Sequence, residues 1–120
     1  MREVTLRIES NVQAPGKSRS HLAHLRKSLE PRYEDVLLVV SELVSNSVRH
    51  SDSENIDLTV QAKDGHIRVE VTDGGPGFTR DTPRGEGLGL TIIEKLSDRW
   101  GLVSDHRFTV WAELNRGPAG

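Results

Sequence analysis

The chain has 120 residues, with 16 lysines and arginines against 18 aspartates and glutamates, a formal net charge of −2 and no cysteine. This length fits one domain of ordinary size, so we expect a single domain over residues 1–120. The nearly neutral charge argues against direct binding to nucleic acid or to an anionic membrane, and the lack of cysteine excludes disulfides, thiol nucleophiles and thiolate zinc sites. No stretch approaches the roughly 20 apolar residues of a membrane span, which predicts a cytoplasmic protein.

The N-terminal part of the chain is predicted to form a strand followed by a helix. Apolar Val4, Leu6 and Ile8 alternate with polar residues, which is typical of a strand with one buried face. Ser18 is a candidate N-cap for the next helix, which carries three leucines at helical spacing and should end near Pro31. These leucines are Leu22, Leu25 and Leu29.

A longer helix and a β-hairpin are predicted for the middle of the chain. Between about residues 33 and 50, six apolar side chains fall on one side of a helical wheel. They are Val36, Val39, Val40, Leu43, Val44 and Val48. Residues 56–62 and 67–71 both alternate between apolar and polar side chains, and Lys63-Asp64-Gly65 between them is typical of a hairpin turn.

The C-terminal part is predicted to contain a glycine-rich loop, a short helix and a last strand. Glycine is too frequent in residues 73–89 for the interior of a helix or strand. A helix is predicted from residue 90 to near residue 101, a strand over residues 108–114, and a disordered tail over residues 115–120. Since each predicted strand has one polar face, helices should cover only one side of the sheet, which favours a two-layer α/β sandwich with a mostly antiparallel sheet.

Glu42 and Asn46 form the first of three clusters that suggest chemistry. They lie four residues apart on the long predicted helix, on the same face and at the edge of its apolar stripe. The carboxamide oxygen of Asn46 is a ligand suited to Mg²⁺, and Glu42 beside it could orient or deprotonate a hydroxyl group. The alternative is that both residues simply border the core.

Asp73 opens the second cluster, directly after a predicted strand. Its ionised carboxylate accepts hydrogen bonds only, so it suits the exocyclic amine of adenine and would repel the carbonyl group of guanine. Gly75 and Gly77 would let the backbone approach a ligand closely. The alternative is an ordinary glycine-rich turn.

Gly85, Gly87, Gly89 and Leu90 form the third cluster, which runs into a predicted helix. A glycine-rich loop at a helix N-terminus offers backbone N–H groups and the positive end of the helix dipole, and phosphate is the anion that such a place favours. The spacing differs from the dinucleotide-binding fingerprint, because Leu90 stands where that motif has its third glycine. The alternative is a flexible hinge without a ligand.

The order of the three clusters resembles the N, G1 and G2 boxes of the GHKL superfamily, whose ATP-binding domain is called the Bergerat fold. Within it, the chain is most similar to the anti-sigma-factor serine kinases of bacteria, especially actinobacterial ones. Residues 41–50, 98–101 and 109–114 carry this finer resemblance. The short segment between the second and third clusters favours a serine kinase over a sensor histidine kinase.

The resemblance implies a role for each residue of the three clusters. Asn46 would ligate Mg²⁺, Glu42 would act as general base on a partner's serine, and Asp73 would bind the adenine amine. The remaining residues would border the nucleotide: Gly75 and Gly77 as the floor of the adenine pocket, and Gly85, Gly87, Gly89 and Leu90 in the lid over the phosphates. Many relatives have glycine and a small or polar residue where this chain has Arg107 and Phe108.

The resemblance implies a protein serine kinase that depends on ATP and Mg²⁺. It would phosphorylate a STAS-type anti-sigma-factor antagonist and, in its other partner state, sequester a sigma factor, as a possible homodimer and without contacting nucleic acid or membrane. The alternatives are an ATP-gated protein-binding module that transfers no phosphoryl group and a domain of this fold that has lost its nucleotide.

Overall fold

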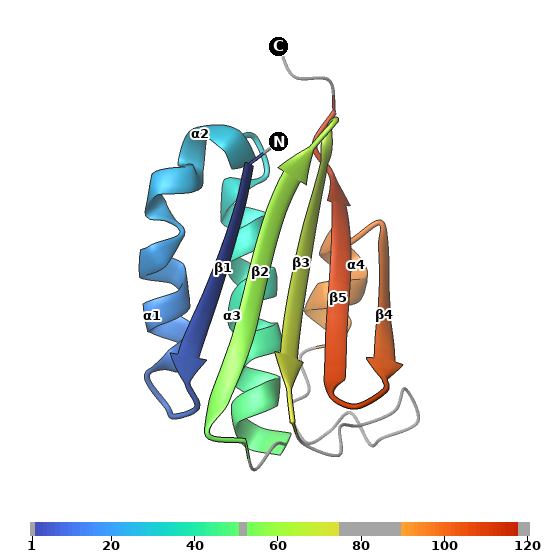
Figure 1. Ribbon diagram of the computed structural model, residues 1–120. Helices are drawn as coiled ribbons and strands as arrows, with labels where there is room; N and C mark the ends of the chain where they lie inside the picture. Colours follow the sequence, from blue (N-terminus) through green and yellow to red (C-terminus); the bar gives the residue numbers. More distant parts are fainter. Residues whose placement is uncertain (1, 51–52, 75–89, 118–120) are drawn as a thin grey trace.

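The computed structural model describes residues 2–50, 53–74 and 90–117, and shows a two-layer α/β sandwich (Figure 1). Five antiparallel strands form one sheet in the order β1-β2-β3-β5-β4, and the helices lie on one face of it. The predicted fold class is confirmed. The strands are β1 (Arg2–Glu9), β2 (Asn55–Lys63), β3 (His66–Asp73), β4 (Arg99–Ser104) and β5 (Phe108–Asn115), and the helices are α1 (Ala14–His21), the 3-10 helix η1 (Ala23–Leu25), α2 (Arg26–Leu29), α3 (Tyr33–His50) and α4 (Leu90–Leu96).

The long helix and the hairpin form where the sequence predicts them. Helix α3 buries its apolar stripe against the sheet. In the turn between β2 and β3, Asp64 and Gly65 have φ values of 52° and 81°. Two consecutive residues with positive φ are what a two-residue hairpin turn of type I′ requires, and an Asp-Gly pair adopts them easily.

The first helix differs from its prediction, because it begins at Ala14 and Ser18 does not cap it. Pro15 lies in the first turn, where its missing N–H costs no helical hydrogen bond. Ser18 is buried inside α1, and its hydroxyl group donates to the carbonyl oxygen of Ala14 at 2.8 Å. The three leucines are divided among the residue that follows α1, the 3-10 helix and α2.

The C-terminal part also differs from its prediction at two places. Helix α4 ends at Leu96, and residues 99–104 form the edge strand β4. The predicted disordered tail is ordered at its start, because the backbone N–H of Arg116 donates to the carbonyl oxygen of Gly65 at 2.6 Å. The guanidinium group of Arg116 also donates to the carbonyl oxygen of Ser28.

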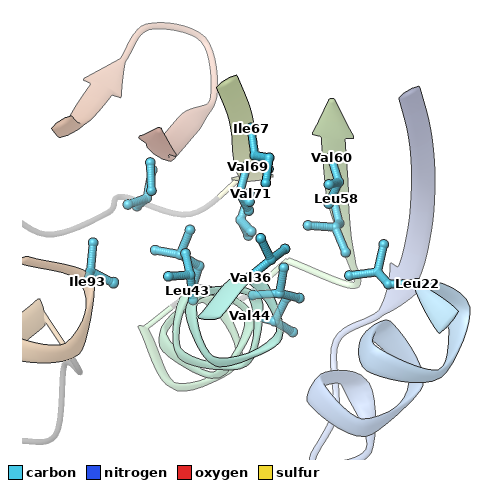
Figure 2. Close-up of a cluster of buried hydrophobic side chains, with 14 of the residues drawn as sticks. Leu22, Val36, Leu43, Val44, Leu58, Val60, Ile67, Val69, Val71 and Ile93 are labelled. Carbon is cyan, nitrogen blue, oxygen red and sulfur yellow. The ribbon is translucent and has the colours of Figure 1, made fainter. Parts of the chain in front are cut away.

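The hydrophobic core lies between the inner face of the sheet and the helices, with α3 at its centre (Figure 2). Alternate residues of β2, β3 and β5 are buried, so the period-two patterns of the sequence correspond to the inner face. Full burial of one such aliphatic side chain contributes about 1.5–3 kcal/mol. The largest fully buried side chains include Leu22, Leu29, Leu43, Ile56, Leu58, Ile67, Leu90, Ile93 and Leu114.

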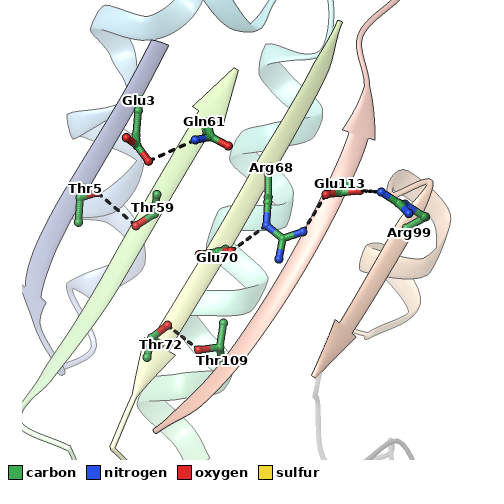
Figure 3. Close-up of polar contacts among 10 residues, drawn as sticks. All are labelled: Glu3, Thr5, Thr59, Gln61, Arg68, Glu70, Thr72, Arg99, Thr109 and Glu113. Atoms are coloured by element: carbon green, nitrogen blue, oxygen red, sulfur yellow. Dashed lines mark hydrogen bonds and ion pairs between the residues drawn. The ribbon is translucent and has the colours of Figure 1, made fainter. Parts of the chain in front are cut away.

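The outer face of the sheet is polar and held by charged pairs (Figure 3). Arg68 pairs with Glu70 and with Glu113, each at 2.7 Å, and Arg99 also pairs with Glu113. The guanidinium group of Arg68 lies over the ring of Trp111, 4.5 Å from the ring centroid. Burial opposes ionisation of Glu113, but the hydrogen bonds from both arginines outweigh it and lower the pKa of this carboxyl group.

A second charged cluster joins β1, β2 and the residue before β5. The carboxylate of Asp57 pairs with Arg7 at 2.9 Å and with Arg107 at 2.6 Å. The hydrogen bond from Arg7 is the main reason why the pKa of Asp57 is lowered, and Arg107 acts in the same direction. None of the described helices combines the length and apolar composition needed to cross a bilayer.

Candidate functional site

A buried hydrogen bond connects the C-terminal half of α3 to the end of β3. The hydroxyl group of Ser47 donates to Oδ2 of Asp73 at 2.7 Å. Both side chains are almost fully buried, with 5% of Ser47 and 2% of Asp73 exposed. Since Ser47 directly follows Asn46, this bond holds the first and second predicted clusters next to each other.

Asn46 is a fully buried polar residue whose oxygen faces a cation. Its Oδ1 accepts a hydrogen bond at 3.0 Å from Nη2 of Arg49, which lies three residues later on the same helix. The Asn46 oxygen is thus oriented toward a positively charged side chain.

Asn46 carries an oxygen of the kind that Mg²⁺ accepts in proteins. Among the described residues, no group of three histidine, cysteine, aspartate or glutamate side chains could hold a metal ion. Asn46 alone offers one oxygen ligand, Oδ1. Mg²⁺ is commonly bound by one or two protein side chains together with phosphate oxygens and water.

Glu42 lies on α3 one turn before Asn46 and is partly exposed. Within the part of the chain that the structure describes, no hydrogen bond or ion pair holds its carboxylate. This carboxylate is therefore accessible to a hydroxyl group that approaches α3 from solvent, as a general base must be.

Asp73 lies at the last position of β3, where the strand register pairs it with Phe108 of β5. Phe108 is 4% exposed and points to the helix layer together with Val110, so it joins the core. The neighbouring Thr109 faces the other way, and its hydroxyl group contacts that of Thr72 at 2.7 Å on the outer face (Figure 3). Asp73, which the sequence analysis proposes as the residue that binds adenine, thus lies beside the aromatic ring of Phe108 in the core.

The glycine clusters are described only at their borders. The N–H of Gly74 donates to Oγ of Ser53 at 2.5 Å. Leu90 is the first residue of α4, and its side chain is 1% exposed, so it packs in the core. The other predicted positions, Gly75, Gly77, Gly85, Gly87 and Gly89, lie outside the described residues.

The structure adds two residues to this site that the sequence analysis missed. Ser47 follows Val36 by 11 residues, about three helical turns, so it falls in the middle of the apolar stripe. A polar residue in the middle of an apolar stripe is the sequence signal that indicates a buried hydrogen bond at Ser47. Arg49 was harder to find, because only its spacing of three residues from Asn46 relates the two.

Residues 32–118 match the profile of the family described as histidine kinase-, DNA gyrase B- and HSP90-like ATPases. The oxygen sensor histidine kinase NreB of Staphylococcus carnosus is 32% identical over 83 residues, which cover 68% of this chain and 23% of that protein. The serine-protein kinase RsbW of Staphylococcus aureus is 26% identical over 98 residues, which cover 64% of this chain and 62% of RsbW. The chain thus spans less than two thirds of either relative.

The solved structures support the same fold. The crystal structure of the RsbU and RsbW domains of a Mycobacterium tuberculosis protein covers 96% of this chain with a TM-score of 0.70 at 19% identity, and the match takes up 32% of that chain. The histidine kinase AdeS of Acinetobacter baumannii covers 98% with a TM-score of 0.60 at 16% identity, over 70% of its own chain. The protein described here belongs to the family of histidine kinase-, DNA gyrase B- and HSP90-like ATPases.

Proposed function

We propose that this ATPase-family domain is a protein serine kinase of the anti-sigma-factor type. Its substrate would be a serine of a STAS-type anti-sigma-factor antagonist, and its second partner a sigma factor. The family match supports ATP binding, and the similarity to the serine-protein kinase RsbW supports the choice of serine. The observation that carries the proposal is the buried Ser47–Asp73 hydrogen bond, because it holds a carboxylate suited to adenine beside the candidate metal ligand Asn46.

Recognition of the base would depend on the hydrogen-bonding character of Asp73. A carboxylate accepts but does not donate, so it pairs with the amine of adenine and repels the carbonyl group of guanine. The Ser47 hydroxyl group donates to Oδ2 and so fixes the position of this carboxylate. Ser47 would therefore orient the carboxylate that reads the nucleotide.

Phosphoryl transfer would use Glu42 and Asn46 from the same face of α3. Glu42 accepts the proton of the serine hydroxyl group, whose oxygen forms a bond to the γ-phosphorus while the bond from that phosphorus to the bridging oxygen breaks and ADP leaves. Asn46 would hold Mg²⁺, and the ion would supply charge neutralisation at the phosphates. Most of the acceleration would come from positioning and charge neutralisation.

Nucleotide selectivity can be tested by thermal melting. A ligand at 100 times its dissociation constant stabilises a protein by about 2.7 kcal/mol, so Mg-ATP should raise the melting temperature while Mg-GTP at the same concentration should not. No shift with ATP, or an equal shift with GTP, would refute the role of Asp73.

Catalysis can be tested separately with ATP labelled at the γ-phosphate and a panel of recombinant STAS-type antagonist domains. The wild type should form phosphoserine on at least one of them, and Glu42→Gln should abolish transfer while the affinity for Mg-ATP stays within twofold. If the wild type binds ATP but phosphorylates no member of the panel, the domain is the non-catalytic ATP-gated module instead.

A further inference from the structure

Phe108 lies at the end of the sheet that carries Asp73. It is the first residue of β5, and the strand register pairs it with Asp73, the last residue of β3. Directly opposite residues of an antiparallel pair have Cβ atoms about 4.5–5.5 Å apart. Both side chains are buried on the inner face, whereas the next pair of the register, Thr72 and Thr109, lies on the outer face (Figure 3). Phe108 is thus the strand neighbour of the carboxylate that would bind adenine.

This pair brings together two residues that stand out in the core. Among the residues that the structure describes, Asp73 is the only buried charged residue, and Phe108 is the only buried aromatic residue on a strand. The other buried residues of β5 are aliphatic, namely Val110, Ala112 and Leu114. An aromatic ring donates no conventional hydrogen bond to a carboxylate and does not replace the water that the carboxylate loses on burial. Stabilisation of Asp73 therefore does not explain the ring beside it.

A purine bound to Asp73 would meet this ring. Asp73 and Phe108 are 2% and 4% exposed, so a base whose amine reaches the carboxylate leaves water and packs against the side chains around it. Purines have flat faces, and aromatic side chains stack on such faces whatever the base is. The ring offers neither a donor nor an acceptor to the exocyclic group, so the choice between an amine and a carbonyl group is left to Asp73.

We propose that Phe108 is a specificity-determining residue of the nucleotide site, an inference that rests on the proposed function. Its ring forms a wall of the adenine pocket beside Asp73 and packs against the base. Because this wall lies next to the carboxylate that accepts from the exocyclic amine, it limits the size of any substituent on that amine. Asp73 thus selects the chemical group at this position of the purine, and Phe108 selects its size.

The experiment compares ATP with N⁶-benzyl-ATP on the full chain. The benzyl group is bulky, but the exocyclic nitrogen keeps one N–H that can donate to Asp73. Phe108→Ala and Phe108→Val both remove the ring, and valine suits a strand, so Phe108→Val gives the answer if Phe108→Ala does not fold. The dissociation constant of each Mg-nucleotide complex is measured by calorimetry, at a temperature where circular dichroism shows that the variant is folded.

Leu114→Ala is the matched control. It removes a fully buried side chain from the same face of the same strand, six residues further along β5. This distance is about 20 Å at the rise of an antiparallel strand. A general loosening of the core would affect this variant as well, whereas a change in the wall of the adenine pocket would not.

We expect the wild type to bind N⁶-benzyl-ATP about 50-fold or more weakly than ATP, because the benzyl group clashes with the ring. In Phe108→Ala and Phe108→Val this ratio of dissociation constants should fall by about tenfold or more, since the space of the ring becomes available. ATP itself should bind about fivefold or more weakly to Phe108→Ala, because a stacking contact is lost. Leu114→Ala should keep the ratio within about twofold of wild type, since it lies far from the pocket.

Three results would overturn the role of Phe108 and leave the proposed function standing. The first is a wild type that binds both nucleotides equally well, and the second is a ratio that stays unchanged in the folded Phe108 variants. The third is an equal fall of the ratio in Leu114→Ala, because the effect would then come from the core as a whole. The proposed function is judged separately by the preference for ATP over GTP and by phosphoryl transfer. A chain that bound no ATP would overturn both.

Discussion

Replacing Ser47 with alanine tests whether the buried bond to Asp73 organises the site. The substitution removes a donor 2.7 Å from a buried carboxylate. Hydrogen bonds to charged groups contribute about 1.5–3 kcal/mol, and alanine returns roughly 0.5 kcal/mol through its better helix propensity. We therefore expect Ser47→Ala to lower the free energy of unfolding by about 1–2.5 kcal/mol. At roughly 4 °C per kcal/mol for a domain of this size, the melting temperature should fall by about 4–10 °C.

Ser18→Ala is a matched control for this experiment. Ser18 is also a buried helical serine, but it donates to a neutral backbone carbonyl at 2.8 Å within its own helix. Its replacement should cost less than 1 kcal/mol, since the acceptor is uncharged and alanine favours the helix (about 0.5–1.5 kcal/mol against about 0.5 kcal/mol). Urea unfolding compares Ser47→Ala with Ser18→Ala. The coupling of the pair follows from Ser47→Ala, Asp73→Asn and the double variant, measured in the same way.

The same variants separate a role in binding from a role in folding alone. If Ser47 orients the carboxylate that reads adenine, Ser47→Ala should weaken Mg-ATP binding in calorimetry, and Ser18→Ala should not. The reasoning is wrong if Ser47→Ala is no less stable than Ser18→Ala, or if its double-mutant coupling with Asp73→Asn is near zero.

Two further predictions concern the outer face of the sheet. A Cβ atom at Gly101 would lie 2.9 Å from ring atoms of Trp111. Gly101→Ala should therefore destabilise the protein by about 1–3 kcal/mol, measured by urea unfolding. Stability within about 0.5 kcal/mol of wild type would contradict the steric argument. The lowered pKa values of Asp57 and Glu113 predict a loss of stability in acid, since these carboxylates stabilise the fold fully above their ordinary pKa values of 3.8 and 4.5 and lose this contribution as the pH falls through their folded values. Unfolding between pH 7 and pH 3 should therefore show a shallower acid decline for Asp57→Asn than for wild type, and equal slopes would contradict this prediction.

The elements that the sequence predicts well are those with an uninterrupted period. Strands β2, β3 and β5 alternate cleanly, and α3 carries a continuous apolar stripe, so pattern and structure agree. Strand β4 was not predicted because Gly101 occupies its middle and is its only buried residue. The ring of Trp111 on the neighbouring strand β5 lies where a side chain at position 101 would be.

The errors at the helix ends have local causes. Ser18 was predicted as the N-cap because serine is a preferred N-cap residue. The helix instead begins at Ala14, with Pro15 in its first turn and no side-chain cap. The start of the tail is ordered by long-range contacts of Arg116 with the β2–β3 turn and with α2, which local sequence does not reveal. The roles of Glu42, Asn46 and the glycine-rich loop remain predictions, because each depends on a nucleotide.

Helix α3 connects these proposals, because its side chains point in three directions. One side is fixed in the core of the domain, which gives the helix a rigid position against the sheet. A second side reaches the end of β3 through Ser47, and a third presents Glu42 and Arg49 toward solvent. Under these proposals, one helix positions both Asp73, which would recognise the adenine, and Glu42, which would act as the general base. Their relative geometry is then set when the domain folds, before ATP or the acceptor binds.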